Sequence, residues 1–206
     1  RADATGFKDP GPEDKVALPG PGSNQHILLA MAAEKELGDA RALDDIIEAM
    51  PHPDAATALL SRQDVTCYYG APPYQYELLK QPGIKQIGDG FSAFGDAFSY
   101  IVAVAAGRFY REQPQTYQAF CAALADSLEF IRAHPEEAAE ILARVEKTVP
   151  AATYREHLTW PGTRWDITPR GITHYAAYMQ QAGYIKKAPA SWKEVTYPNL
   201  HALPGS

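Results

Sequence analysis

Strand-like and helix-like segments alternate over the first ninety or so residues, and this alternation limits the chain to few folds. Short apolar runs typical of strands lie at residues 15–19, 46–50, 65–69 and 84–87. Amphipathic, helix-like stretches lie between them at residues 24–37, 54–60 and 73–80. Strands that alternate with helices form parallel sheets, because each helix carries the chain back to the same end of the sheet. The sequence therefore predicts an α/β fold in which helices flank a parallel sheet.

Local residue choices predict where several helices begin and end. Gly38 follows the first helical stretch, and glycine is the residue most often found just after a helix. Asp54 suits the capping of free amides at the start of the second helix. Thr168 is predicted to cap a later helix that Gly183 ends.

The chain changes character after a connection rich in glycine and aromatic residues, near residues 88–98. Residues 99–105 form a further apolar run, which predicts one more strand. The rest is predicted to be mostly helical, with helices that begin at Pro114, Pro135 and Pro150. The predicted domains are an α/β lobe at residues 1–90 and a return strand with helices at residues 91–206.

Composition excludes several functional classes. The net charge is −6 and the basic residues are scattered, whereas nucleic-acid binding needs clustered Lys and Arg, so no nucleic acid is expected as a partner. No apolar run is long enough to cross a membrane. The six histidines show no metal-ligand spacing such as HExxH, so neither a metal nor another cofactor is expected.

The sequence contains no motif of covalent catalysis. There is neither a GxSxG elbow nor a Ser/His/Asp order, so the chain is not expected to be an enzyme. His52, close to Asp54 in the stretch MPHPDAA, fits a solvated turn residue better than a catalytic base. Cys67 and Cys121 belong to no CxxC pair and fit small core residues. A catalytic thiol or a disulfide is the alternative for these two residues.

The turn between the first strand and the first helix is a candidate binding site. Gly20 and Gly22 allow the backbone to approach a ligand closely. Ser23, Asn24 and Gln25 add side-chain donors to the free amides of a helix start, which favour an anion. The alternative is that Ser23 only caps the helix. The turn is neither GxGxxG nor a phosphate-binding loop, so a nucleotide is not expected.

A second candidate loop follows the third strand, in the stretch DVTCYYGAPPYQYE. It is expected to emerge at the same sheet edge as Ser23, because the strands are parallel. Tyr68 and Tyr69 alternate faces, so one can point into the core and the other toward a cleft. The residues predicted to bind a ligand are Gly22, Ser23, Asn24, Gln25, Tyr69, Gly70 and Ala71.

Three stretches together carry a resemblance to a known family. They are DKVALPGPGSNQHILLAMAAEKELG, EAMPHPDAATALLSRQDVTCYYGAPPYQYELLKQPGI and YAAYMQQAGYIKKAPASWKEV. In order and spacing they resemble the nitrate/sulfonate/taurine group of ABC-transporter substrate-binding proteins, which includes carriers of thiamine-type pyrimidines. The resemblance extends from about Phe7 to Leu203.

The resemblance implies a type II periplasmic-binding fold, in which two lobes close around a small solute. It implies a solute-binding component of an ABC importer, periplasmic or lipid-anchored, that delivers an anionic or heteroaromatic solute to a membrane permease. Residues 1–90 look like lobe two, and residues 98–105 look like the strand that returns to lobe one. Residues 23–25 and 69–71 match the two ligand-facing loops of the family.

This sequence departs from the family in one respect: nothing in it corresponds to the first half of lobe one. A chain without that half is expected to expose apolar surface, which favours dimerisation or misassembly. The alternative functions are two. One is a thiamine-pyrimidine synthase of the same fold, although the cysteine-rich, iron-linked motif of that fungal enzyme is missing here. The other is a regulatory module that senses a ligand.

Overall fold

The computed structural model describes residues 4–62 and 64–206. The chain groups into two compact units, each made of more than one stretch. Unit 1 comprises Arg1–Phe98, Gly171–Ser191 and Ser206, and unit 2 comprises Ser99–Arg170 and Trp192–Gly205. Unit 1 therefore includes residues 171–191, which the sequence pattern assigns to the helix-rich second part.

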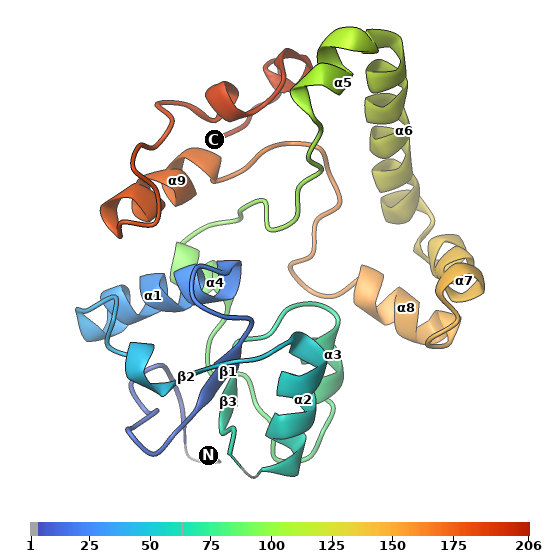
Figure 1. The fold of residues 1–206 in the computed structure, drawn as a ribbon. Coiled ribbons are helices and arrows are strands. Elements are labelled where there is room, and N and C mark those ends of the chain that lie inside the picture. The colour runs from blue at the N-terminus through green and yellow to red at the C-terminus, as the bar shows by residue number, and fades with distance from the viewer. Residues whose placement is uncertain (1–3, 63) are drawn as a thin grey trace. The chain divides into compact units, whose positions relative to one another are not determined.

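A three-stranded parallel sheet forms the centre of unit 1 (Figure 1). Its strands are β1 (Val16–Leu18), β2 (Ile47–Ala49) and β3 (Cys67–Tyr68), in the order β2-β1-β3. Val16 lies in register with Ile47 on one side and with Cys67 on the other. The first three predicted strands are thus confirmed as neighbours in one parallel sheet.

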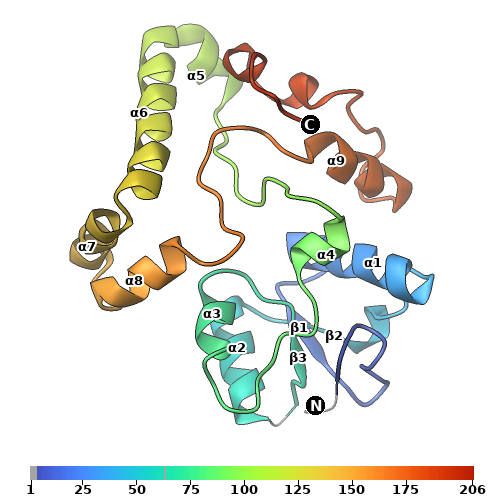
Figure 2. The same ribbon diagram turned by 180° about the vertical axis from the view of Figure 1, so that it is seen from behind.

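Helices cover both faces of this sheet, as Figures 1 and 2 show from opposite sides. The helices of unit 1 are α1 (Asn24–Leu37), α2 (His52–Ser61), α3 (Tyr74–Leu78), α4 (Gly90–Phe94) and α9 (Ile172–Gln181), with a 3-10 turn at Asp44–Ile46. On one face, Val16 and Leu18 pack with Leu29 of α1 and Ala93 of α4. On the other, Ala17 packs against Ala55 of α2. The predicted α/β fold with a helix-flanked parallel sheet is confirmed.

The central position of β1 explains its uninterrupted apolar sequence. Val16, Ala17 and Leu18 are at most 4% exposed, because helices cover both of the faces to which they alternate. A strand buried on both faces has no polar face to show in its sequence.

The first predicted helix agrees with the structure at both ends. The Ser23 hydroxyl caps α1 by accepting a hydrogen bond from the His26 backbone N–H at 3.2 Å. At the other end Gly38 adopts a left-handed conformation and donates to the carbonyl of Glu34.

Two predicted caps are wrong. Helix α2 begins at His52 after Pro51, so Asp54 lies inside the first turn, where its charge complements the helix dipole instead. Helix α9 is preceded by Gly171 rather than by Thr168, whose own backbone N–H donates to Asp166.

Two predicted strands are also absent among the described residues. Residues 84–87 form no strand, because Gln81 to Ile84 make a hydrogen-bonded turn and no neighbouring strand follows. Residues 99–105 form no strand either: the chain bends at Ile101, and the run pairs with none of the three strands of the sheet. An apolar run becomes a strand only where a second strand supplies its hydrogen bonds.

Unit 2 is built from helices and turns. Its helices are α5 (Gly107–Glu112), α6 (Pro114–Ala133), α7 (Pro135–Glu146) and α8 (Ala151–Leu158), with 3-10 turns at Trp192–Val195 and Pro198–Leu200. Pro114 and Pro135 occupy the first helical position and Pro150 directly precedes α8, as predicted. Ala138, Ala139 and Leu158 form the small buried core between α7 and α8.

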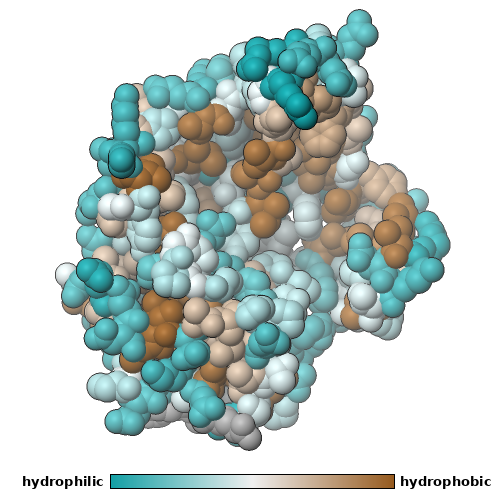
Figure 3. Space-filling model, in the orientation of Figure 1, coloured by the Kyte–Doolittle hydropathy of each residue, from teal (hydrophilic) through white to brown (hydrophobic). Residues whose placement is uncertain are grey.

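Apolar side chains also reach the surface, and Figure 3 shows them in brown among hydrophilic residues. Large hydrophobic side chains that are more than half exposed belong to Ile101, Val102, Val104, Val145 and Val195. None of the helices in the described part of the chain is both long and apolar enough to span a membrane.

Candidate functional site

Three loops leave the sheet of unit 1 at its carboxyl edge and each leads into a helix. They join β1 to α1, β2 to α2 and β3 to α3. Because the strands are parallel, the three loops start at the same edge, which is where open α/β sheets bind ligands. Both loops of the predicted site belong to this set, together with the β2–α2 loop that the sequence interpretation left out.

The β1–α1 loop has a backbone shape that requires glycine. Gly20 and Gly22 have φ values of 139° and 79°, a region that other residues rarely adopt. The backbone N–H of Gly22 donates to Nδ1 of His26 at 3.0 Å. The Ser23 backbone N–H also donates to the Gly20 carbonyl at 3.2 Å, so two amides of the loop are already used inside the protein.

The remaining residues of this loop differ in access to solvent. Gly22 and Asn24 are exposed, Ser23 is half-buried and Gln25 is buried. The Oδ1 atom of Asn24 accepts a hydrogen bond from the Tyr175 hydroxyl of α9 at 3.1 Å. A ligand can thus reach Gly22 and Asn24 directly, whereas Gln25 supports the site from behind.

His52 connects all three loops through its two ring nitrogens. Its Nε2 lies 3.1 Å from Nε2 of Gln25, and its Nδ1 lies 2.6 Å from the Tyr68 hydroxyl. The ring also stacks on Tyr74, with centroids 5.7 Å apart. His52 is therefore half-buried and hydrogen-bonded on both sides, and its interpretation as a solvated turn residue is wrong.

The partners of His52 define its protonation. The Gln25 amide nitrogen can only donate, so Nε2 of His52 accepts and the neutral ring carries its proton on Nδ1. That N–H then donates to the oxygen of Tyr68. Burial lowers the pKa of His52 below its ordinary value of 6.5, because the charged ring loses hydration.

This lowered pKa predicts a pH dependence of folding. The unfolded chain binds a proton at His52 more readily than the folded chain does, so stability should fall as pH decreases from about 6.5 through the lowered pKa. Urea unfolding between about pH 7.5 and 5 measures this slope. His52→Gln should give a flatter profile than the unaltered chain, whereas identical profiles would show that His52 titrates alike in both states.

The second predicted loop, residues 69–71, offers fewer side chains to a ligand than the sequence predicts. Tyr69 stacks on Phe7, with centroids 6.4 Å apart and an interplanar angle of 28°, and packs against the α1 side of the core. Tyr68 lies on the α2 side. A flat ring cannot contact both tyrosines, because the sheet separates them. Gly70 is needed where it is, since a Cβ there would come within 2.7 Å of the Tyr68 ring.

A second histidine holds the β1–α1 loop, and the sequence interpretation did not select it. Nε2 of His26 lies 3.4 Å from Asp44, and Nδ1 lies 3.2 Å from the Tyr184 hydroxyl in addition to the Gly22 amide. A histidine in the first turn of an apolar helix, directly after a glycine-rich turn, was the signal available in the sequence.

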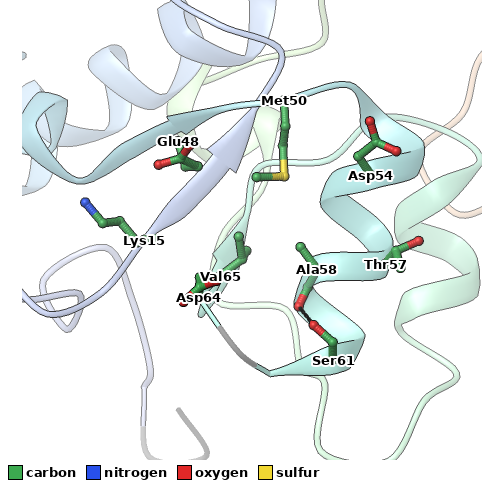
Figure 4. Close-up of a pocket in the computed structure, with 9 residues that line it drawn as sticks. All are labelled: Lys15, Glu48, Met50, Asp54, Thr57, Ala58, Ser61, Asp64 and Val65. Atoms are coloured by element: carbon green, nitrogen blue, oxygen red, sulfur yellow. Dashed lines mark hydrogen bonds between the residues drawn. The ribbon is translucent and has the colours of Figure 1, made fainter.

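A separate pocket of about 650 Å³ lies beside β2 and α2 (Figure 4). It is lined by Lys15, Glu48, Met50, Asp54, Thr57, Ala58, Ser61, Asp64 and Val65. In Figure 4 the Met50 side chain reaches into the space between β2 and α2, and the Ser61 hydroxyl donates back to Ala58 of its own helix. None of the predicted ligand-binding residues lines this pocket.

Over residues 4–62 and 64–206, no group of three or more His, Cys, Asp or Glu side chains is arranged to hold a metal ion. Ala71 belongs to the second loop and is 8% exposed, and its carbonyl accepts a hydrogen bond from the Tyr74 backbone N–H at 3.0 Å, so its side chain offers a ligand no polar contact. Comparison of the chain with protein-family models, with curated proteins and with solved structures finds no match.

Proposed function

We propose that this chain is the solute-binding component of an ABC importer and that unit 1 supplies one wall of its binding site. The observation that carries the proposal is the hydrogen-bonded set Gln25–His52–Tyr68, which joins three strand-to-helix loops at one sheet edge. Binding needs such a pre-formed polar edge and no nucleophile. In this proposal the fold is of the type II periplasmic-binding class. The protein is periplasmic or lipid-anchored at the outer face of the bacterial cytoplasmic membrane, and its partner is an ABC permease in that membrane.

The proposed solute is a small anion, such as a sulfonate, nitrate or carboxylate. Helix α1 begins beside the exposed residues Gly22 and Asn24, and the start of a helix favours negative charge. A heteroaromatic solute receives less support, because Tyr68 and Tyr69 lie on opposite sides of the sheet.

A thermal-shift screen tests this function. The purified protein is heated with taurine, alkanesulfonates, nitrate, pyrimidines and flavins in turn, since a ligand that binds only the folded state raises the melting temperature. A rise with one of the anions supports the proposal. Turnover of any of these compounds, or no shift with any of them, contradicts it.

Substitutions at the start of α1 separate binding from capping. Ser23→Ala removes the cap, so it should lower stability by about 1 kcal/mol. If the solute binds here, Ser23→Ala and Asn24→Ala should each weaken its binding by about 1–3 kcal/mol, because hydrogen bonds to an ionised group are strong. Calorimetric titration and thermal unfolding provide the two measurements.

Asp89→Ala is the matched control for these substitutions. Asp89 caps α4 through the Ser92 backbone N–H at 2.7 Å, so its loss should have a similar effect on stability and none on affinity. If Ser23→Ala and Asn24→Ala both left the affinity unchanged, the β1–α1 turn would serve only to cap α1.

A further inference from the structure

His26 is a buried histidine at which three segments of unit 1 meet. Its side chain is 10% exposed. Nδ1 lies 3.0 Å from the Gly22 backbone nitrogen and 3.2 Å from the Tyr184 hydroxyl, and Nε2 lies 3.4 Å from Oδ1 of Asp44. Both ring nitrogens therefore have partners inside unit 1, and one of these partners is an amide of the candidate site.

These partners define the neutral form of the ring. A backbone N–H can only donate, so Nδ1 of His26 carries the lone pair that accepts from Gly22. The proton of the neutral ring is then on Nε2, where it donates to the Asp44 carboxylate. In this form His26 holds the Gly22 amide toward the protein, where a solute cannot use it.

The protonated ring has acceptors for both of its N–H groups but none for the Gly22 amide. Nε2–H keeps Asp44, and the new Nδ1–H can donate to the Tyr184 oxygen, because a hydroxyl also accepts. Burial raises the pKa of Tyr184, so its hydroxyl stays neutral in this role. The Gly22 N–H then faces another N–H and has room to turn away, since Gly22 is exposed and no atom lies within 4 Å of the position that a Cβ would take.

We propose that His26 is a proton switch for the solute site: when neutral it holds the Gly22 amide inward, and when protonated it releases this amide to an anion. The inference rests on the proposed anion site at the start of α1. A positive ring in the first turn of a helix is unfavourable, and a bound anion offsets that cost. Because such coupling is reciprocal, proton uptake strengthens anion binding and the anion strengthens proton uptake.

The charges around the ring favour this direction. Residues 19–23 carry no charged side chain. Asp44 contacts the ring but also pairs with Arg41, whose Nε lies 3.0 Å from Oδ2 of Asp44. Tyr178 of α9 lies near Glu34 and Asp44, and burial raises its pKa to about 12, so it stays neutral. Because Arg41 already offsets part of the Asp44 charge, an anion at the turn supplies negative charge that the protonated ring lacks.

Binding of methanesulfonate between about pH 8 and 5 tests the coupling, because histidine changes its charge in this range and the sulfonate does not. The affinity should rise as pH falls, by up to about tenfold per pH unit, with up to about one proton taken up per anion. Titration calorimetry in two buffers of different ionisation enthalpy counts these protons. In His26→Asn, Oδ1 takes the place of Nδ1 as acceptor but binds no proton, so the affinity should not depend on pH. His52→Gln should keep the dependence, whatever its affinity.

NMR of the unaltered, ligand-free chain tests the switch without any variant. Nitrogen chemical shifts of the ring should show the Nε2–H form at about pH 8, and the Gly22 amide signal should move on the same titration curve as the ring. A Gly22 signal that stays constant while the ring titrates, or a ring that stays neutral down to about pH 5, overturns the switch. Methanesulfonate binding with equal affinity at every pH overturns the coupling. If the switch is seen but no anion binds at any pH, the proposed solute is wrong and the proton switch stands.

Discussion

Replacement of Leu18 by Ala is expected to lower the free energy of unfolding of unit 1 by about 2–5 kcal/mol. Leu18 is fully buried in the central strand and packs in the core cluster with Leu29 of α1. Removal of its outer carbons leaves a cavity, because the strand is fixed by hydrogen bonds on both sides. Urea unfolding followed by far-ultraviolet circular dichroism measures the loss.

Leu60→Ala is the control for this change. Leu60 lies on α2 and is 49% exposed, so its truncation should change stability by no more than about 0.5 kcal/mol. All three tryptophans of the chain belong to unit 2, so fluorescence reports that unit separately. Equal effects of the two leucine variants would mean that the core of unit 1 is not packed around β1.

Gly171→Ala is expected to destabilise unit 1 by about 2–5 kcal/mol, through two independent causes. Gly171 has a φ of 68°, which strains any residue with a side chain. A Cβ there would also lie 2.7 Å from the ring of Phe94 and 3.0 Å from Cβ of Phe98. Phe94 cannot move aside freely, because it is 6% exposed and stacks on Phe98 with centroids 4.7 Å apart.

Gly38→Ala separates the two causes. Gly38 has a φ of 80°, but no atom lies within 4 Å of the position that a Cβ would take. The substitution should therefore lower stability only through backbone strain, by about 1–2 kcal/mol. Thermal or urea unfolding of both variants gives the difference, which measures the crowding beside Phe94. If both variants lost the same stability, residues 171–191 would not be packed against α4.

The parts of the fold that the sequence predicts correctly are those set by local residue patterns. The run Val16–Leu18 is apolar because it is buried on both faces, and Gly38 and Pro114 mark helix ends by their own backbone preferences. Residues 99–105 have a similar apolar composition but form no strand, because pairing depends on a segment distant in sequence. Composition indicates that a segment is able to form a strand, and the presence of a neighbouring strand decides whether it forms one.

In the candidate site, too, the features set by local sequence were predicted and those set by distant contacts were not. The glycines and Ser23 were found because a strand, a turn and a helix follow one another along the chain. His52 was missed because its partners, Gln25 and Tyr68, come from two other loops and meet it only when the parallel sheet has formed. Alternation along the strand leaves open which of Tyr68 and Tyr69 faces a cleft, and the choice of Tyr69 rests on the family resemblance alone; in the structure Tyr69 packs against the α1-side core.

The interrupted course of unit 1 has a consequence for synthesis on the ribosome. Asn24 and His26 are made before Tyr175 and Tyr184, which contact them, and the whole stretch 99–170 is made in between. The early segment therefore emerges with the start of α1 uncovered until residues 171–191 have been made. Closure itself costs little more than for a short loop, since loop entropy grows only with the logarithm of length. The maturation of unit 1 is thus timed by the translation of unit 2.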